Sequence, residues 1–187
     1  MGELKEFQKL VIANAKHVNG LKAGDKAPDF TLLNATGKKI SLKECLKSGP
    51  VILKFYRGEW CPYCNLDLKQ VQMYLPQIES FGAQVLAISP QNPDNALTAQ
   101  QKNNLEFEVL SDSDQKVIKA YNLQFDPGAD YHVRRDLTKS NGDGSKLLPV
   151  PATFIIDQDF NVVASHVEAD YTQRMSAEDI LKVLEKM

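Results

Sequence analysis

Two cysteines three positions apart are the residues in this sequence best suited to chemistry. Cys61 and Cys64 lie in the segment WCPYC (residues 60–64), which follows an apolar run and opens a stretch with helical period. Residues three apart on a helix lie roughly 5 to 6 Å from each other, a separation that a disulfide tolerates. The spacing therefore predicts a thiol pair that opens and closes a disulfide without refolding.

The start of the predicted helix favours Cys61 as the reactive thiol. Free N–H groups and the helix dipole at an N-terminus stabilise an anion and lower a thiol pKa from about 8.5 to as little as 3.5 to 7.5. Pro62 suits the first helical position, where its missing donor would have no partner anyway. Trp60 and Tyr63 are the aromatic neighbours of the pair. Cys61 is thus expected to attack and Cys64 to resolve.

A zinc site is the alternative use of two closely spaced cysteines, because two thiolates make half of a tetrahedral site. The remaining candidates, Cys45 and the three histidines, are dispersed along the chain. We therefore predict no metal and no dissociable cofactor, and interpret Cys45 as a buried residue without a chemical role.

Composition restricts the class of protein. The chain has 187 residues, of which 43% are hydrophobic and 25% charged, with a formal net charge of −2. These values are typical of one soluble domain and argue against a nucleic-acid binder, which normally carries a basic surface. No apolar run approaches the length of a membrane span, and the first residues do not resemble a signal peptide. We expect a cytoplasmic, reducing location, where paired cysteines are more often catalytic than structural.

Strands and helices are predicted to alternate, which indicates an α/β fold with parallel crossovers. A break is expected at Pro76 within the helix that begins at the cysteines, since proline lacks a donor N–H. Residues 126–149 are turn-rich and are predicted to be a long loop or insertion. The expected helices cover 3–18, 61–81, 94–104, 114–121 and a C-terminal stretch from Ser176; the expected strands cover 30–33, 40–42, 51–56, 83–89, 107–110, 151–157 and 161–167.

Four segments resemble the peroxiredoxins of the alkyl hydroperoxide reductase and thiol-specific antioxidant group. They are GDKAPDFTL, KFYRGEWCPYC, FEVLSDSDQKVIKAY and PATFIID, in the family's order and spacing. The resemblance implies a thioredoxin-like fold, with a central mixed β-sheet flanked by helices and the cysteines at the end of the strand through Phe55. Residues 21–187 would form this domain, and residues 1–20 an added N-terminal helix within a single-domain protein.

The active-site segment departs from the peroxiredoxin pattern Pro-x-x-x-Thr-x-x-Cys. The peroxide-attacking cysteine of the family falls on Cys64, while Arg57 replaces the proline and Cys61 replaces the threonine. Where the family has an arginine before the strand that resembles TFIID, this sequence has Pro151. The residues considered to supply the missing charge are Arg57, Arg134 and Arg135.

The same segment resembles thioredoxins and glutaredoxins. Trp60 before the pair resembles thioredoxins, and the tetrapeptide Cys-Pro-Tyr-Cys resembles glutaredoxins. Pro151 resembles the proline of the cis-proline loop that faces the disulfide in both; an ordinary trans proline is the alternative. The buried acid of thioredoxin has no counterpart in a gapless match, because Phe55 falls there and Lys54 comes next. Glu59 is the nearest candidate proton shuttle, with an exposed loop glutamate as the alternative.

Together these features predict a thiol–disulfide oxidoreductase with an antioxidant role. Cys61 would attack a substrate disulfide, Cys64 would resolve the mixed disulfide, and an external thioredoxin- or glutathione-like thiol would regenerate the pair. The resemblance also makes a homodimer plausible. No nucleic-acid or membrane partner is expected.

Two alternatives stay open at this point. In a hydroperoxide reductase the roles reverse, so that Cys64 attacks the peroxide, becomes a sulfenic acid and condenses with Cys61. In a non-enzymatic redox sensor or binding module, the disulfide would change the shape of the 126–149 segment for a partner.

Overall fold

The computed structural model describes residues 2–187, and the side chains of residues 5–187. Among these described residues, no helix is both long and apolar enough to cross a lipid bilayer. The helices are α1 (Gly2–Ala15), α2 (Leu42–Leu46), α3 (Pro62–Met73), α4 (Leu75–Ser80), α5 (Pro93–Asn103), α6 (Lys116–Ala120), α7 (Ala129–Arg134) and α8 (Ala177–Leu184), with a 3-10 turn at Leu137–Lys139. The strands are β1 (Thr31–Asn34), β2 (Lys39–Ser41), β3 (Val51–Phe55), β4 (Gln84–Ser89), β5 (Glu108–Ser111), β6 (Gln124–Phe125), β7 (Leu148–Pro149), β8 (Ala152–Ile156) and β9 (Val162–Val167).

A seven-stranded mixed sheet forms the centre of the molecule, as predicted. Its strand order is β2-β1-β5-β4-β3-β8-β9. The three middle strands β3, β4 and β5 are parallel, whereas β8 runs antiparallel to β3 and β9 antiparallel to β8. The strands predicted at 30–33 and 40–42 are present as β1 and β2, which pair antiparallel. Parallel strands require crossover helices, and α3 with α4, and then α5, provide them.

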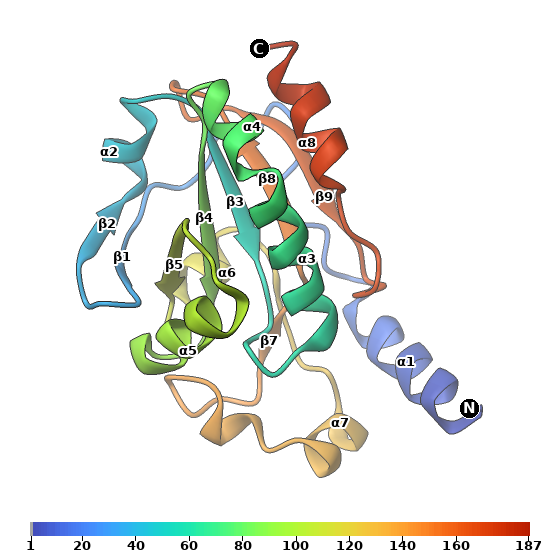
Figure 1. The fold of residues 1–187 in the computed structure, drawn as a ribbon. Helices are drawn as coiled ribbons and strands as arrows, with labels where there is room; N and C mark the ends of the chain where they lie inside the picture. Colours follow the sequence, from blue (N-terminus) through green and yellow to red (C-terminus); the bar gives the residue numbers. More distant parts are fainter. Residues whose placement is uncertain (1) are drawn as a thin grey trace.

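Both faces of the sheet are covered, so the fully buried strand β3 contributes to two cores. Val51, Leu53 and Phe55 pack with α2 and α6 on one face. Ile52 points to the other face and packs with α3, α4, α5 and α8. Figure 1 shows α3 and α4 lying across the sheet in front of β3, with α8 beside them. Because side chains alternate along a strand, Lys54 shares the face of Ile52 and lies toward α3.

The predicted break near Pro76 is confirmed. Helix α3 ends at Met73, Tyr74 leaves the helical conformation, and α4 starts at Leu75 with Pro76 in its first turn. Proline is tolerated there because N–H groups of a first helical turn have no intrahelical acceptor. The break turns the chain toward Gly82, whose φ of 71° ends the helical region before β4.

Residues 126–149 are more ordered than a long loop. They contain α7 and the 3-10 turn, and the strand pair β6–β7 closes the segment at its base. Tyr131, Leu137 and Leu148 form a small core with Val11 and Ala15 of α1. The sequence prediction was incomplete because α7 is too short to give a clear helical period, and its buried residue Tyr131 packs against a helix from the other end of the sequence.

Candidate active site

Cys61 and Cys64 lie where β3 leads into α3, as predicted from their spacing. Cys61 is the N-cap residue, its Sγ accepting a hydrogen bond from the Cys64 backbone N–H at 3.4 Å, and Pro62 follows in the first turn. Both cysteines are free thiols with fully buried side chains. The structure therefore shows the reduced pair, and a substrate reaches Sγ only after covering groups move.

Arg57 supplies a positive charge directly to Cys61. Its Nη2 donates a hydrogen bond to Cys61 Sγ at 3.2 Å, although the side chain is only 4% exposed. The guanidinium lies 4.0 Å from the ring centroid of Tyr171 and 5.6 Å from that of Trp60. Aromatic rings stabilise a cation while excluding water. A buried guanidinium is thus fixed next to the first thiol of the pair.

The pKa values of the two thiols are shifted in opposite directions. A hydrogen bond from the Cys64 side chain, together with the charge and hydrogen bond of Arg57, lowers the pKa of Cys61 to about 5 despite burial. Burial, followed by the interaction with Cys61, raises the pKa of Cys64 well above its ordinary value. At neutral pH Cys61 is the thiolate and Cys64 the thiol. Since the thiolate is the nucleophile, this arrangement supports Cys61 as the attacking group.

A buried ion pair behind Cys64 was missed by sequence reasoning. Lys54 Nζ lies 2.9 Å from Asp67 Oδ1 and also donates to Thr153 Oγ1 at 2.8 Å, with both charged side chains almost fully buried. In the gapless match the acid of thioredoxin has no counterpart on β3; the buried acid near the pair is Asp67, on α3. Two signals could have located it, a lysine within an otherwise apolar strand and an aspartate three residues after Cys64 on one helix face.

Arg174 completes this group from the opposite end of the sequence. It lies in the segment 168–175 between β9 and α8. Its Nη2 is 3.8 Å from Cys64 Sγ, and its Nε is 3.4 Å from Asp67 Oδ2. No motif surrounds Arg174 in the sequence, and only the path of the chain after β9 brings it to the pair.

Other predicted charges lie outside this cluster. The carboxylate of Glu59 is 3.7 Å from Lys102, and among the described residues it makes no hydrogen bond or ion pair with either cysteine. Arg134 stacks on Phe7 and Arg135 on Trp60, at 4.6 and 4.3 Å from the ring centroids. Of the three arginines considered from the sequence, Arg57 is the one that contacts a thiol.

The peptide bond before Pro151 is trans, as are all the others described, which corrects the expectation of a cis bond at this position. The backbone N–H of Val150 donates to Leu123 O at 2.8 Å, next to the pairing of β6 with β7. Val150 and Pro151 thus join β7 directly to β8.

Cys45 lies away from the thiol pair. It is half-buried, not fully buried as predicted, and packs against the core on the opposite face of the sheet from α3. Burial raises its pKa, which makes it a poor nucleophile. No cluster of three or more potential metal ligands occurs in the part of the chain with described side chains.

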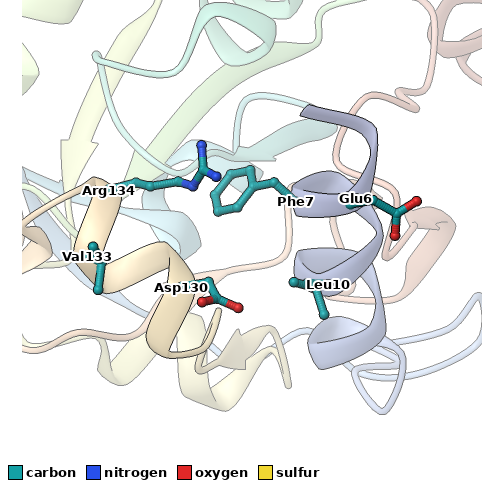
Figure 2. A pocket seen from close by; sticks show the side chains of 6 residues that line it. All are labelled: Glu6, Phe7, Leu10, Asp130, Val133 and Arg134. Carbon is teal, nitrogen blue, oxygen red and sulfur yellow. The ribbon is translucent and has the colours of Figure 1, made fainter. Parts of the chain in front are cut away.

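Two grooves lie near the pair. One of about 350 Å³ runs beside Cys64 and is lined by Tyr63, Leu66, Asp67, Gln70, Thr172 and Arg174. A larger one of about 490 Å³ lies between α1 and α7, where Phe7 lies beside Arg134 and Leu10 faces Asp130 (Figure 2). Only the first has residues of the charged cluster in its wall, and Tyr63 stands half-exposed at its edge.

Comparisons with known proteins agree with this architecture. The chain is 25% identical to the thiol-disulfide oxidoreductase ResA of Bacillus thuringiensis over 87% of this chain and 79% of that protein. It is 29% identical to a protein of Mycobacterium tuberculosis that bears a provisional peroxiredoxin name, over 81% and 88% of the two chains. The crystal structure of peroxidoxin BcpB from Mycobacterium tuberculosis superposes with a TM-score of 0.71 at 23% identity, covering 89% of this chain and 98% of that one.

The family assignment follows from the match along most of the chain. The profile of the AhpC/TSA family matches residues 23–165, which include both cysteines, Arg57, Lys54 and Asp67. Arg174 lies beyond the matched region. The fold and the thiol pair are those of an oxidoreductase, and the chain belongs to the AhpC/TSA family.

Proposed function

We propose that this protein is a thiol–disulfide oxidoreductase in which Cys61 is the attacking residue and Cys64 the resolving residue. One observation carries the proposal, namely the hydrogen bond at 3.2 Å from the buried guanidinium of Arg57 to Cys61 Sγ. A cation in this position stabilises the thiolate and therefore favours it at neutral pH. The relationship to ResA supports the same activity.

The reaction needs two exchange steps. The Cys61 thiolate attacks one sulfur of a substrate disulfide, the substrate S–S bond breaks, and one substrate thiolate leaves. Cys64 then loses its proton and attacks Cys61 Sγ, which releases the second substrate thiolate and forms the Cys61–Cys64 disulfide. The substrate gains two electrons and the cysteine pair loses two. An external thiol reductant returns the pair to the reduced state.

Hydroperoxide reduction is the second candidate, because the family and the Mycobacterium tuberculosis relative include peroxiredoxins. In its sequence-based form Cys64 attacks the peroxide. That role is unfavourable here, since the pKa of Cys64 is raised by burial and by the Cys61 thiolate. Family membership also favours an enzyme over a non-enzymatic redox sensor.

Trapping with single-cysteine variants tests the assignment. Cys64→Ser, treated with a low-molecular-weight disulfide, should retain a mixed disulfide on Cys61 in mass spectrometry, while Cys61→Ser should form little adduct. The same variants are then mixed rapidly with hydrogen peroxide while the fluorescence of Trp60, the single tryptophan, is followed. Fast saturating oxidation in Cys61→Ser, absent in Cys64→Ser, would contradict the proposal and establish the peroxidase.

The proposal extends to the cellular setting. A pair of cysteines that cycles between thiol and disulfide fits a reducing compartment such as the cytoplasm. A thioredoxin- or glutathione-like thiol would reduce the Cys61–Cys64 disulfide after each cycle. A homodimer is part of the same proposal. Recycling assays with each reductant and sedimentation of the reduced protein are the corresponding measurements.

A further inference from the structure

We propose that Arg174 is a catalytic residue for the second exchange step, in which it stabilises the thiolate of Cys64, and that Asp67 positions it. The inference rests on the proposed function, because it assumes that Cys61 attacks first. It goes beyond that function by identifying what makes the second cysteine reactive.

The geometry places one cation at each sulfur. Arg57 Nη2 lies 3.2 Å from Cys61 Sγ, and Arg174 Nη2 lies 3.8 Å from Cys64 Sγ. The two arginines come from different segments, Arg57 from the loop before α3 and Arg174 from the segment 168–175. Each sulfur therefore has its own guanidinium.

Asp67 fixes the position of Arg174. Its Oδ2 is 3.4 Å from Arg174 Nε, while its other oxygen is held at 2.9 Å by Lys54. Both Lys54 and Asp67 are more than nine-tenths buried, so water screens these interactions weakly. The backbone carbonyls of Tyr171 and Gln173 accept hydrogen bonds from Arg174 Nη1, which leaves Nη2 directed at Cys64.

The charge count explains why Arg174 acts in the second step and not in the first. In the reduced pair, the guanidinium groups of Arg57 and Arg174 face two anions, Asp67 and the Cys61 thiolate. Lys54 adds a hydrogen bond to Asp67, but burial lowers the pKa of its ammonium group. When Cys61 becomes part of a mixed disulfide, its charge disappears. Two guanidinium groups then face one carboxylate, and a thiolate on Cys64 would restore the earlier balance.

The same change removes what opposes ionisation of Cys64. Its pKa in the reduced pair is raised first by burial and then by the hydrogen bond and charge of Cys61, whereas Arg57 and Arg174 lower it. Once Cys61 is neutral, burial is opposed by both arginines. The phenols of Tyr56 and Tyr131 also face the pair, and burial raises the pKa of both, so they stay neutral.

A two-phase reaction with dithiobis(nitrobenzoate) tests the inference. In a Cys45→Ser background, attack by Cys61 releases one thionitrobenzoate and forms a mixed disulfide. Attack by Cys64 then forms the Cys61–Cys64 bond, breaks the bond from Cys61 to the reagent sulfur, and releases a second thionitrobenzoate. Stopped-flow absorbance separates the phases, and Cys64→Ser, which lacks the second one, assigns them.

Arg174→Met should slow the second phase by about 3-fold to 30-fold and leave the first nearly unchanged. The range follows because a cation at this distance shifts a thiol pKa by about 1 to 3 units, and greater intrinsic nucleophilicity offsets about half of the lost thiolate. The pH midpoint of the second phase should rise, and Arg174→Lys should restore part of the rate. Arg134→Met, which removes an arginine that contacts neither thiol, is the matched control.

Three results would overturn the inference. They are a second phase that is unchanged in Arg174→Met, a loss of both phases in equal proportion with an unmoved pH midpoint, and no recovery in Arg174→Lys. A wild-type protein in which Cys61 forms no adduct at all would instead contradict the proposed function, because the first phase reports it independently of Arg174.

Discussion

The surroundings of Cys61 and Cys64 differ sharply although the two thiols are three residues apart and equally buried. Cys61 caps a helix and faces a guanidinium held between aromatic rings. Cys64 lies inside the first turn, against Asp67, Lys54 and Arg174. The first environment holds one guanidinium, whereas in the second the carboxylate of Asp67 lies between Lys54 and Arg174 and offsets part of their positive charge.

The difference shows that burial alone does not decide the reactivity of a thiol. Burial raises the pKa of both cysteines, yet only Cys61 receives enough hydrogen bonds and charge to reverse that effect. The thiol of Cys64 itself donates one of those hydrogen bonds. Cys61 is therefore the nucleophile while Cys64 stays protonated. Cys64 becomes a thiolate only after Cys61 has reacted and lost its charge.

Replacing Asp67, the anion near Cys64, should have the largest effect on the free energy of unfolding. Asp67→Asn leaves Lys54 and Arg174 buried without a countercharge, and breaking a buried pair from one side costs about 3 to 5 kcal/mol. Urea unfolding of the reduced protein measures this change. Asp136→Asn is the control, because its ion pair with Lys139 is exposed to solvent and should contribute little to stability. Equal losses for the two variants would show that the buried cluster does not stabilise the fold.

Replacing Arg57, the cation beside Cys61, should have the second-largest effect. Arg57→Met should raise the pKa of Cys61 from about 5 by about 1 to 3 units, which corresponds to about 1.4 to 4 kcal/mol. The pH dependence of iodoacetamide alkylation, in the Cys45→Ser background, gives this pKa. A profile that does not move would mean that the Cys64 thiol and the helix start hold the thiolate without Arg57.

The same variant has a consequence for stability against pH. The pKa of Cys61 is depressed in the folded protein relative to about 8.5 in an unfolded chain. The thiolate therefore stabilises the reduced protein fully above pH 8.5 or so, and this contribution is lost as pH falls toward about 5. In Arg57→Met the rise in stability between these two pH values should be smaller, and in Cys61→Ser it should be absent.

The smallest effect is expected from the aromatic contact. Tyr171→Leu keeps an apolar side chain against Arg57 but removes the ring whose centroid lies 4.0 Å from the guanidinium. Such contacts are worth about 0.5 to 2 kcal/mol. The alkylation profile of Cys61 should shift upward by less than in Arg57→Met. A shift as large as that of Arg57→Met would show that Tyr171 holds the guanidinium in place.

The elements around the sheet were predictable because their signals are local. The apolar run at 51–55, the repeat after Cys64 and the proline at 76 gave β3, α3 and the break before α4. The segment 126–149 was not resolved into α7 and its neighbours, since its buried apolar residues pack against elements distant in the sequence, α1 among them. Periodicity detects an amphipathic helix of several turns better than a helix of six residues.

The sequence by itself determined the chemistry available to this protein: a pair of thiols at the spacing of one helical turn, after a buried strand and at the start of a helix. Those features depend on neighbours in the chain, so they can be read from residue types and spacing. Only the tertiary structure decided how the two thiols divide the work. Arg174 lies 110 positions from Cys64, and Lys54 and Asp67 meet across a strand and a helix. Because a charge acts through distance in space and the surrounding dielectric, its effect on a thiol is fixed only when the chain has folded.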